Sequence, residues 1–502
     1  MTDMVYVNVD GKTVSVPKGT KLKEIISTDI PCGGRGRCGK CKVFAQGNLS
    51  PFSVSEMNNL TAEERKNGIR LACMVNLEGD CTIQTISKNS ENKILTDGKF
   101  NIEVNEPIFK KYGIAIDIGT TTIAAKLYDI HGNELCESTG MNPQAKWGAD
   151  VISRIEASLK GEKHALAKTI RSEINNIIEV VAQKADISAK DIDGIVLTGN
   201  TAMLHLLTDT DVEPLSKAPF EAKRLFNEEL YAKDLDLTNA DNNATVYLPP
   251  CISAFIGADT VCALIASEID TTDDTKILVD IGTNGEMALF RNGELLVCST
   301  AAGPAFEGAG ISMGMSGKNG AVDHAETVNG KICAHVIGET EAVGICGSGL
   351  VDVVKCLLET GIIDETGYME DDPVHITGKV FLTQEDMRMV QLAKSSIYAG
   401  INTMLITSDV ELNEVSKLLI AGGFGSYLNT NNAGRIGLLP MELISKSAIL
   451  GNAALSGATM LLLNKSMKIK ATEIALKAKV IPLSANPIFT EEYMEQMMFP
   501  TI

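Results

Sequence analysis

The 502-residue sequence predicts an α+β domain at its N-terminus, followed by a larger α/β unit of two related lobes. Two observations lead to this fold class. An apolar run that ends in an acid and a glycine-polar turn occurs twice, at residues 113–122 and 277–286. A loop rich in cysteine and glycine lies at residues 31–41. The expected boundaries are a small domain at 1–90, a linker at 91–110, a first lobe at 111–273 and a second lobe at 274–502.

Composition narrows the classes of function. A net charge of −19 and a pI near 4.9 argue against a general nucleic-acid binder. No stretch approaches the ~20 uninterrupted apolar residues of a membrane span. The N-terminal residues, Met1 to Asp10, include acids and no apolar signal core. We therefore expect a cytoplasmic protein that binds neither nucleic acid nor membrane.

The N-terminal segments alternate as strands do. Val5 to Val9 and Thr13 to Val16, joined by Asp10-Gly11, predict a β-hairpin, and a short helix is expected at Leu22 to Ile26. The loop that follows has the cysteine spacing C-x5-C-x2-C, and one further cysteine comes much later. Zinc sites pair cysteines in two matched knuckles, so this spacing disfavours zinc and favours thiolates around a small inorganic core.

The segment resembles the [2Fe-2S] ferredoxin fold, an α+β β-grasp domain, over about residues 3–90. The resemblance implies a [2Fe-2S] cluster with four ligands: Cys32, Cys38, Cys41 and Cys73. Cys81 competes for the fourth place, but Asp80 to Ile83 has the pattern of the closing strand. The other cysteines are expected to be small buried hydrophobes: Cys136, Cys251, Cys262, Cys298, Cys333, Cys346 and Cys356.

The two repeated runs each predict a buried strand with a phosphate-binding turn behind it. Asp117 and Asp280 end the strands and could hold Mg²⁺ directly or through water. Each run continues with a strand, a hairpin and another strand, so the pattern indicates a duplication. Later strands also run into glycine, at Gly199 and at Gly422 to Gly425. We expect all four turns to meet at the carboxyl ends of strands.

Several other stretches carry weaker signals. Met141 to Val151 holds the only tryptophan and opens a helical region that reaches about Lys184. His205 is expected to be a core histidine on a helix. Ser348, in Gly347-Ser348-Gly349, either caps the following helix or belongs to an anion site. Gly451 to Ala458 predicts a small-residue helix where two lobes pack closely.

The paired turns and the small-residue helix resemble the actin, sugar kinase and heat-shock chaperone ATPases, or ASKHA superfamily, whose lobes are ribonuclease-H-like. The resemblance implies that Asp117 and Asp280 manage Mg²⁺ and the attacking water, with Glu286 a further candidate for orienting water. It implies phosphate-binding residues Gly119, Thr120, Thr121, Thr122, Gly282, Thr283 and Asn284, and nucleoside-binding residues Gly422, Gly423 and Gly425. No P-loop motif supplies a lysine.

A ferredoxin domain joined to such an ATPase resembles the reductive activators of corrinoid enzymes. Three sequence motifs match this family: Asp280 to Glu286, Ala302 to Gly308 and Asn142-Pro143-Gln144. The resemblance implies ATP-dependent reduction of Co(II) to Co(I) in a corrinoid protein, with a low-potential electron donor as second partner. A homodimer stays a candidate assembly.

Two other functions remain open from the sequence. One is a redox-sensing nucleotide switch, and the other is an ATP-driven electron donor to another low-potential enzyme. A sugar kinase is disfavoured, because the cluster would then have no role.

Overall fold

The computed structural model describes residues 4–26, 34, 36, 39, 41–85, 104–424 and 427–501. Its internal contacts divide the chain into two compact units. The first comprises Met1–Glu91 and Pro143–Gly161, and the second comprises Asn92–Asn142 and Glu162–Ile502. Much of the expected linker lies outside the described residues.

The first unit contains a five-stranded mixed sheet in the order β2-β1-β5-β3-β4. The hairpin of β1 and β2 confirms the predicted one, and β5 pairs parallel to β1. The predicted helix at Leu22 to Ile26 shortens to a 3-10 turn, Leu22–Glu24, in which the amides of Glu24 and Ile25 donate to carbonyl oxygens three residues back rather than four. The elements are β1 (Met4–Val9), β2 (Lys12–Pro17), β3 (Lys42–Leu49), α1 (Val54–Asn59), α2 (Ala62–Lys66), β4 (Ile69–Leu71), β5 (Leu77–Thr85) and, after the chain returns, α3 (Val151–Ala157).

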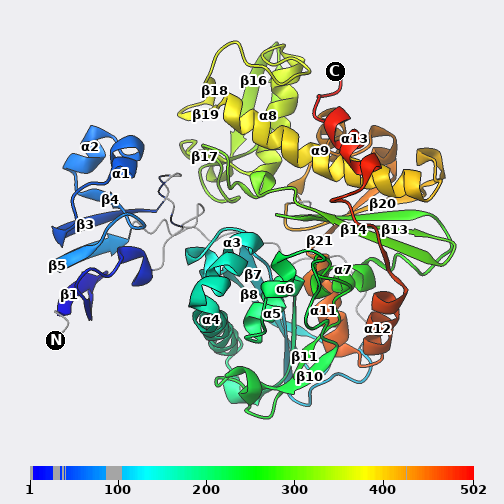
Figure 1. Ribbon diagram of the computed structural model, residues 1–502, viewed down its shortest axis with the longest axis horizontal. Coiled ribbons are helices and arrows are strands. Elements are labelled where there is room, and N and C mark those ends of the chain that lie inside the picture. The colour runs from blue at the N-terminus through cyan, green and yellow to red at the C-terminus, as the bar shows by residue number, and fades with distance from the viewer. Residues whose placement is uncertain are drawn as a thin grey trace. The chain divides into compact units, whose positions relative to one another are not determined.

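The second unit contains two six-stranded sheets with the same plan (Figure 1). The orders are β10-β11-β9-β6-β7-β8 and β21-β20-β12-β13-β14-β22. In each, three strands form an antiparallel meander and two more add in parallel beside its first strand. This shared topology confirms the predicted duplication. The strands are β6 (Tyr112–Ile118), β7 (Thr122–Asp129), β8 (Glu134–Met141), β9 (Ile192–Gly199), β10 (Glu228–Tyr231), β11 (Thr245–Leu248), β12 (Lys276–Ile281), β13 (Gly285–Arg291), β14 (Glu294–Thr300), β20 (Lys417–Ala421), β21 (Ser447–Gly451) and β22 (Lys479–Val480).

Helices and two small sheets complete the second unit. The helices are α4 (Lys163–Lys184), α5 (Thr201–Leu207), α6 (Glu213–Ser216), α7 (Ala258–Ser267), α8 (Gly347–Glu359), α9 (Gln384–Thr407), α10 (Thr430–Arg435), α11 (Ala453–Leu463), α12 (Met467–Lys477) and α13 (Pro487–Glu495). The small sheets use β15 (Ala321–Val328), β16 (Lys331–Val336), β17 (Gly344–Ile345), β18 (Val374–Thr377) and β19 (Val380–Leu382). Together α3 and α4 confirm the helical region expected to reach Lys184.

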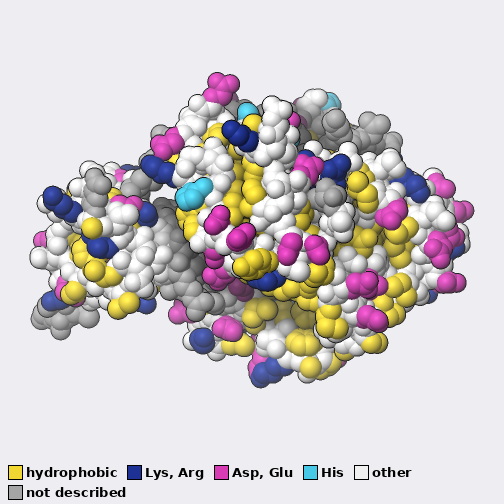
Figure 2. Space-filling view, turned by 90° about the horizontal axis from the view of Figure 1, so that it is seen from above, with side chains coloured by type: hydrophobic (Ala, Val, Ile, Leu, Met, Phe, Trp, Pro, Cys, Tyr) yellow, Lys and Arg dark blue, Asp and Glu magenta, His cyan; other side chains and the backbone are white. Residues whose placement is uncertain are grey.

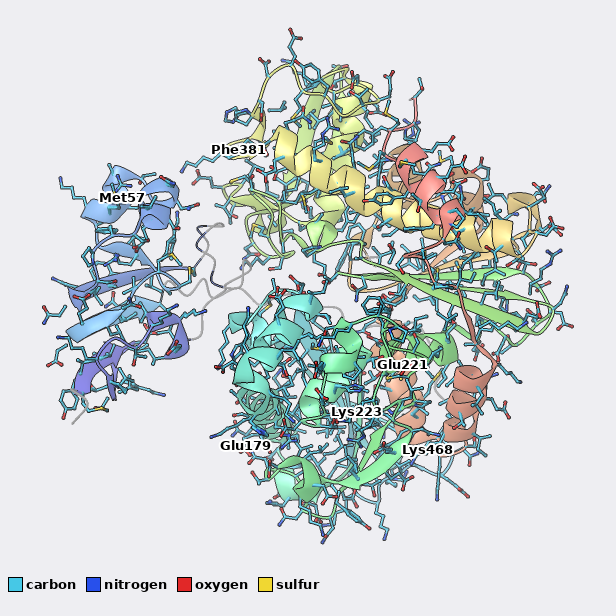
Figure 3. All side chains as sticks on the ribbon, viewed as in Figure 1. Met57, Glu179, Glu221, Lys223, Phe381 and Lys468 are labelled. Carbon is cyan, nitrogen blue, oxygen red and sulfur yellow. The ribbon has the colours of Figure 1, made fainter. Side chains whose placement is uncertain are left out.

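The two lobes pack through α11 and α7, which lie side by side in Figure 1. A Cβ atom on Gly457 of α11 would stand 1.9 Å from the carbonyl oxygen of Cys262 in α7, so only glycine permits this approach. The small-residue helix predicted between the lobes is thereby confirmed. A second contact joins Lys468 of α12, labelled in Figure 3, to Glu229 of β10 at 2.5 Å.

Three single-residue expectations have clear outcomes. His205 is fully buried and its Nδ1 lies 2.7 Å from the carbonyl oxygen of Thr201, which confirms a core histidine. The capping role of Ser348 is wrong: Cys346 holds the N-cap position, and the Ser348 hydroxyl instead donates to the carbonyl oxygen of Asp323 over 3.0 Å. Cys333 is also exposed rather than buried, because it alternates along β16 with Ile332 and Ala334, which pack against the core, and so lies on the opposite face.

The surface agrees with an acidic composition. On the face that Figure 2 shows, Lys and Arg side chains form separate spots among Asp and Glu rather than one continuous basic patch. Across the described part of the chain, no helix combines the length and apolar character needed to cross a membrane.

Candidate functional site

The first phosphate turn joins β6 to β7 and carries Asp117 at its entrance. A Cβ atom on Gly119 would lie 2.6 Å from the carbonyl oxygen of Thr122, so the tight turn requires glycine here. Asn200, the N-cap of α5, donates from Nδ2 to the hydroxyl of Thr120 over 3.1 Å. The turn is therefore held by the neighbouring strand-to-helix junction.

The second phosphate turn joins β12 to β13 in the same way. Asp280 and Glu286 face each other as a directly opposed pair in this antiparallel ladder, so their side chains share one face. The amide of Gly282 donates to the carbonyl oxygen of Asn284 over 3.0 Å and closes the turn. The sequence-predicted residues of this turn thus lie together at one sheet end.

Two contacts join the turns across the lobes. Glu307, the last residue of a 3-10 helix after β14 (Ala305–Glu307), accepts a hydrogen bond from the Thr121 hydroxyl over 3.2 Å and another from the Thr283 hydroxyl. Asn452, which caps α11, donates from Nδ2 to Asp117 over 3.2 Å. The structure therefore brings both predicted turns and both predicted aspartates into one site.

Five half-buried carboxyl groups converge there: Asp117, Asp259, Asp280, Glu286 and Glu307. Burial raises the pKa of Asp117 to about 7, and the nearby Asp259 adds to the shift. Burial likewise raises the pKa of Asp280 to about 7, with Asp259, Asp117 and Glu307 contributing, and that of Asp259 to about 6. The pKa of Glu286 rises well above its usual value for the same reason, with help from Asp259 and Asp280.

This arrangement concentrates negative charge that only a cation can offset. The charged neighbours that perturb these groups are themselves carboxylates. Carboxylate oxygens, used directly or through water, are the ligands that Mg²⁺ prefers. Among the described residues no three of these side chains come close enough together to hold a metal ion by themselves, so Mg²⁺ here would depend on water and on phosphate oxygens for most of its ligands.

Asp259 and Glu307 were not identified from the sequence. Asp259 is the second residue of α7 and follows the Gly257 N-cap by two positions. A Cβ on Gly257 would lie 2.4 Å from the Cα of Asn200, which places the start of α7 against the first lobe's strand end. An acid just behind a glycine at the start of an apolar helix was the available signal. Glu307 lies in a stretch of small residues. The sequence indicated that this stretch packs closely, but not which part of the protein it packs against.

The glycine-rich turn after β20 borders the same acids. Gly422 has a φ of +98°, and a Cβ there would lie 2.5 Å from the carbonyl oxygen of Ile281 and 2.8 Å from Oδ1 of Asp280. Gly423 has no atom within 4 Å of a Cβ. Gly425 lies outside the described residues. The roles assigned to these glycines remain predictions.

The cysteine site belongs to the first unit. Cys41 and Cys73 are both buried, and their sulfur atoms lie 3.3 Å apart. Two thiolates about 2.3 Å from one tetrahedral metal stand about 3.8 Å apart, so this pair fits ligation of a single metal atom. Cys32 and Cys38 lie outside the described residues. Cys81 lies on β5 as predicted, where burial raises the pKa of its thiol.

Comparisons with known proteins cover nearly all of the chain. Residues 112–272 match the family described as the RACo middle region, and residues 274–502 match the C-terminal domain of RACo, the ASKHA domain. The corrinoid activation enzyme RamQ of Eubacterium limosum is 36% identical over 430 residues, covering 79% of this chain and 71% of RamQ. The [Co(II) methylated amine-specific corrinoid protein] reductase of Methanosarcina barkeri is 24% identical over 425 residues, covering 78% of this chain and 77% of the relative.

A solved structure gives the same result. The reductive activator for corrinoid, iron-sulfur protein superposes with a TM-score of 0.72 at 27% identity, covering 99% of this chain and 98% of that one. The paired turns and the shared acid cluster thus occur in a chain whose relatives, over most of its length, are named as activators or reductases of corrinoid proteins. This chain belongs to the family of corrinoid reductive activators that carry an ASKHA domain.

Proposed function

We propose that this protein uses ATP to drive the one-electron reduction of Co(II) to Co(I) in a corrinoid protein. The observation that supports it best is the joining of two phosphate turns by one carboxylate, Glu307, inside a five-acid site that spans both lobes. The names of the relatives, an activation enzyme and a Co(II) corrinoid protein reductase, point to the same chemistry.

The proposed nucleotide site assigns a task to each group. Asp117 and Asp280 hold Mg²⁺ and position water, and Glu286, opposite Asp280, orients that water. Backbone amides of the turns at Gly119 to Thr122 and Gly282 to Asn284 face the phosphates. Gly422, Gly423 and Gly425 border the nucleoside. Catalysis then depends on positioning and electrostatics rather than on a covalent intermediate.

The N-terminal sheet is proposed to be a ferredoxin-like β-grasp domain. Cys41 and Cys73 would hold one side of a [2Fe-2S] cluster, with Cys32 and Cys38 completing the set. Such a cluster supplies a one-electron carrier when bound. A low-potential donor would reduce the cluster, and the corrinoid protein would accept an electron from the cluster.

ATP has a defined thermodynamic task in this scheme. Each ~59 mV of unfavourable one-electron potential costs a factor of ten, or about 1.4 kcal/mol. Nucleotide offsets this only by binding two conformations of the complex with different affinity. Two lobes joined through α11 and α7 and sharing one acid site are suited to such a two-state change.

The test is anaerobic reduction of a Co(II) corrinoid protein. Protein reconstituted with iron and sulfide is mixed with reductant and with the corrinoid protein, with and without Mg-ATP, while the Co(I) absorbance band is followed. Co(I) should form only with ATP and should be lost in Asp280→Ala and Cys73→Ala. An intact cluster and ATPase without Co(I), across several corrinoid proteins, would contradict the proposal and favour the nucleotide switch.

A further inference from the structure

Asn142 binds the first phosphate turn at two points. It lies directly after β8, its backbone amide donates to the carbonyl oxygen of Thr121 over 2.9 Å, and its Nδ2 donates to that of Gly119 over 2.8 Å. Its side chain is only 1% exposed. Any rearrangement of the turn around a phosphate must therefore move Asn142 or break these bonds.

The next residue begins a segment that is compact in its own right. The Trp147 segment, residues 143–161, contains Gln144 and Arg154, both fully buried. Arg154 donates from Nε to the carbonyl oxygen of Gly148 over 3.0 Å, and Asp150 caps α3 by accepting from the amide of Ser153 over 2.7 Å. These internal bonds let the segment move as one body.

The contacts of the Trp147 segment group it with the N-terminal domain rather than with the ATPase lobes on either side of it in sequence. One such contact is the hydrogen bond from Nζ of Lys23 to the carbonyl oxygen of Lys146, over 3.3 Å. The segment is thus covalently continuous with the phosphate turn's anchor and bonded to the domain that carries the cysteines.

The far end of the segment has the features of a hinge. Gly161 lies in a π-helical turn, Ser158–Glu162, with a φ of +103°, and no atom lies within 4 Å of a Cβ built on it. Backbone rotation at this position meets no packed neighbour. Helix α4 begins two residues later at Lys163. The segment can therefore pivot at Gly161 when its other end is pulled by Asn142.

We infer that Asn142 is a positioning residue that transmits the nucleotide state of the first phosphate turn to the N-terminal domain through the Trp147 segment. The inference rests on the proposed nucleotide site and not on the identity of the electron acceptor. It gives a route along the chain from the first phosphate turn to the domain that carries the cysteines.

The protein contains its own reporter for this movement. Trp147 is the only tryptophan in the sequence, and Nζ of Lys146 lies 4.0 Å from its ring centroid. A shift of that ammonium group relative to the indole changes the emission. Titration of the full-length protein with Mg-ATP, followed by tryptophan fluorescence and in parallel by calorimetry, separates movement from binding.

Asn142→Ala should bind Mg-ATP within a few-fold of the wild type, while its fluorescence response falls at least fivefold. Asn133→Ala, at the opposite end of the same strand β8, removes only a bond to Asp129 and should respond as the wild type. A full response in Asn142→Ala would overturn the inference. If the wild type binds Mg-ATP without a change in emission, this inference is wrong but the proposed function stands. If the wild type binds no nucleotide, both the inference and the proposed function are wrong.

Two further variants test the inference without changing Asn142, in case Asn142→Ala does not fold. Gly161→Ala meets no steric neighbour, so it should fold, and its strained φ should diminish the response at unchanged affinity. Lys23→Met should keep the fluorescence response but lose the ATP-dependent change in amide hydrogen exchange of β3, which the wild type should show. Unchanged behaviour in both variants would overturn the inference.

Discussion

Thr121 of the first lobe donates a hydrogen bond to Glu307 of the second lobe over 3.2 Å. The same carboxylate accepts from Thr283, so one acid joins the two turns. At the proposed nucleotide site, the negative charge of a triphosphate would be repelled by Glu307 unless Mg²⁺ lay between them.

Glu307→Gln should therefore strengthen binding of ATP in the absence of Mg²⁺. Removing one negative charge about 10 Å away, at an effective dielectric of about 20, is worth about 1.7 kcal/mol, or roughly fifteenfold in affinity. Calorimetric titration with ATP in EDTA measures the change. Glu294→Gln, on an exposed hairpin where Glu294 pairs with Lys479, is the matched control and should bind as the wild type. Equal affinities for all three proteins would show that Glu307 does not oppose the phosphates.

The Mg²⁺-free protein should lose stability as pH rises from 6 to 8. The pKa values of Asp117 and Asp280 are raised to about 7 in the fold, above the ordinary value of 3.8, so the native state holds protons that the unfolded state has released. The free energy of unfolding then falls as pH passes through this window. Thermal unfolding midpoints measured at several pH values, without Mg²⁺, give the slope.

Asp259→Asn is the partner measurement, because Asp259 is the charge that raises both pKa values most after burial. Its slope should be shallower than that of the wild type. The comparison also cancels the contribution of titratable groups elsewhere, which both proteins share. Lys394 is one of them: burial lowers its pKa to about 7, so its contribution makes the protein more stable as pH rises. Parallel curves for the two proteins would contradict the proposed coupling of the acids.

Cys73→Ser should abolish the visible absorption and the iron and sulfide content of the reconstituted protein. Its thiol lies 3.3 Å from that of Cys41, close enough for the two to be neighbouring ligands of the proposed cluster. Cys81→Ser is the matched control, since Cys81 is also buried in the same sheet but lies on β5, where it packs against Gly47. Loss of the cluster in Cys81→Ser with retention in Cys73→Ser would reverse the assignment of the fourth ligand.

Gly422→Ala should reduce ATP hydrolysis at least tenfold and destabilise the protein by about 1–3 kcal/mol. The added Cβ would sit at a φ of +98° and press on Oδ1 of Asp280, the proposed Mg²⁺ ligand. Gly423→Ala, one residue on, adds a Cβ with no protein atom within 4 Å and should leave the free energy of unfolding unchanged. Wild-type stability and activity in Gly422→Ala would mean that the turn after β20 does not position Asp280.

The local pattern of the sequence predicted much of the ATPase architecture. Each apolar run that ended in an acid and a glycine turn became a strand, β6 or β12, with its turn in the expected place. The two-residue turn at Asn292-Gly293 became the expected hairpin, with both residues at positive φ. These features depend on neighbouring residues, so they can be inferred from periodicity and turn chemistry alone.

Local sequence pattern was insufficient where one side chain could bond either to its own helix or to a distant strand. Ser348 stands at the start of α8 and has a capping side chain, yet its hydroxyl bonds to the carbonyl oxygen of Asp323 on β15. The carbonyl became available only when β15 packed against α8. The choice between capping and this contact was therefore made by tertiary packing.

By itself, the sequence determined that the chain holds two duplicated lobes, where their acidic turns lie, and which cysteines compete for a cluster. Only the tertiary structure decided that Asp259 and Glu307 complete the acid site, that Gly422 leaves no room for a Cβ beside Asp280, and that Asn142 anchors the first turn. The physical reason is range. Strand periodicity and glycine turns are set by adjacent residues, whereas these contacts join segments far apart in the chain, and their energies depend on the burial that assembly of both lobes creates.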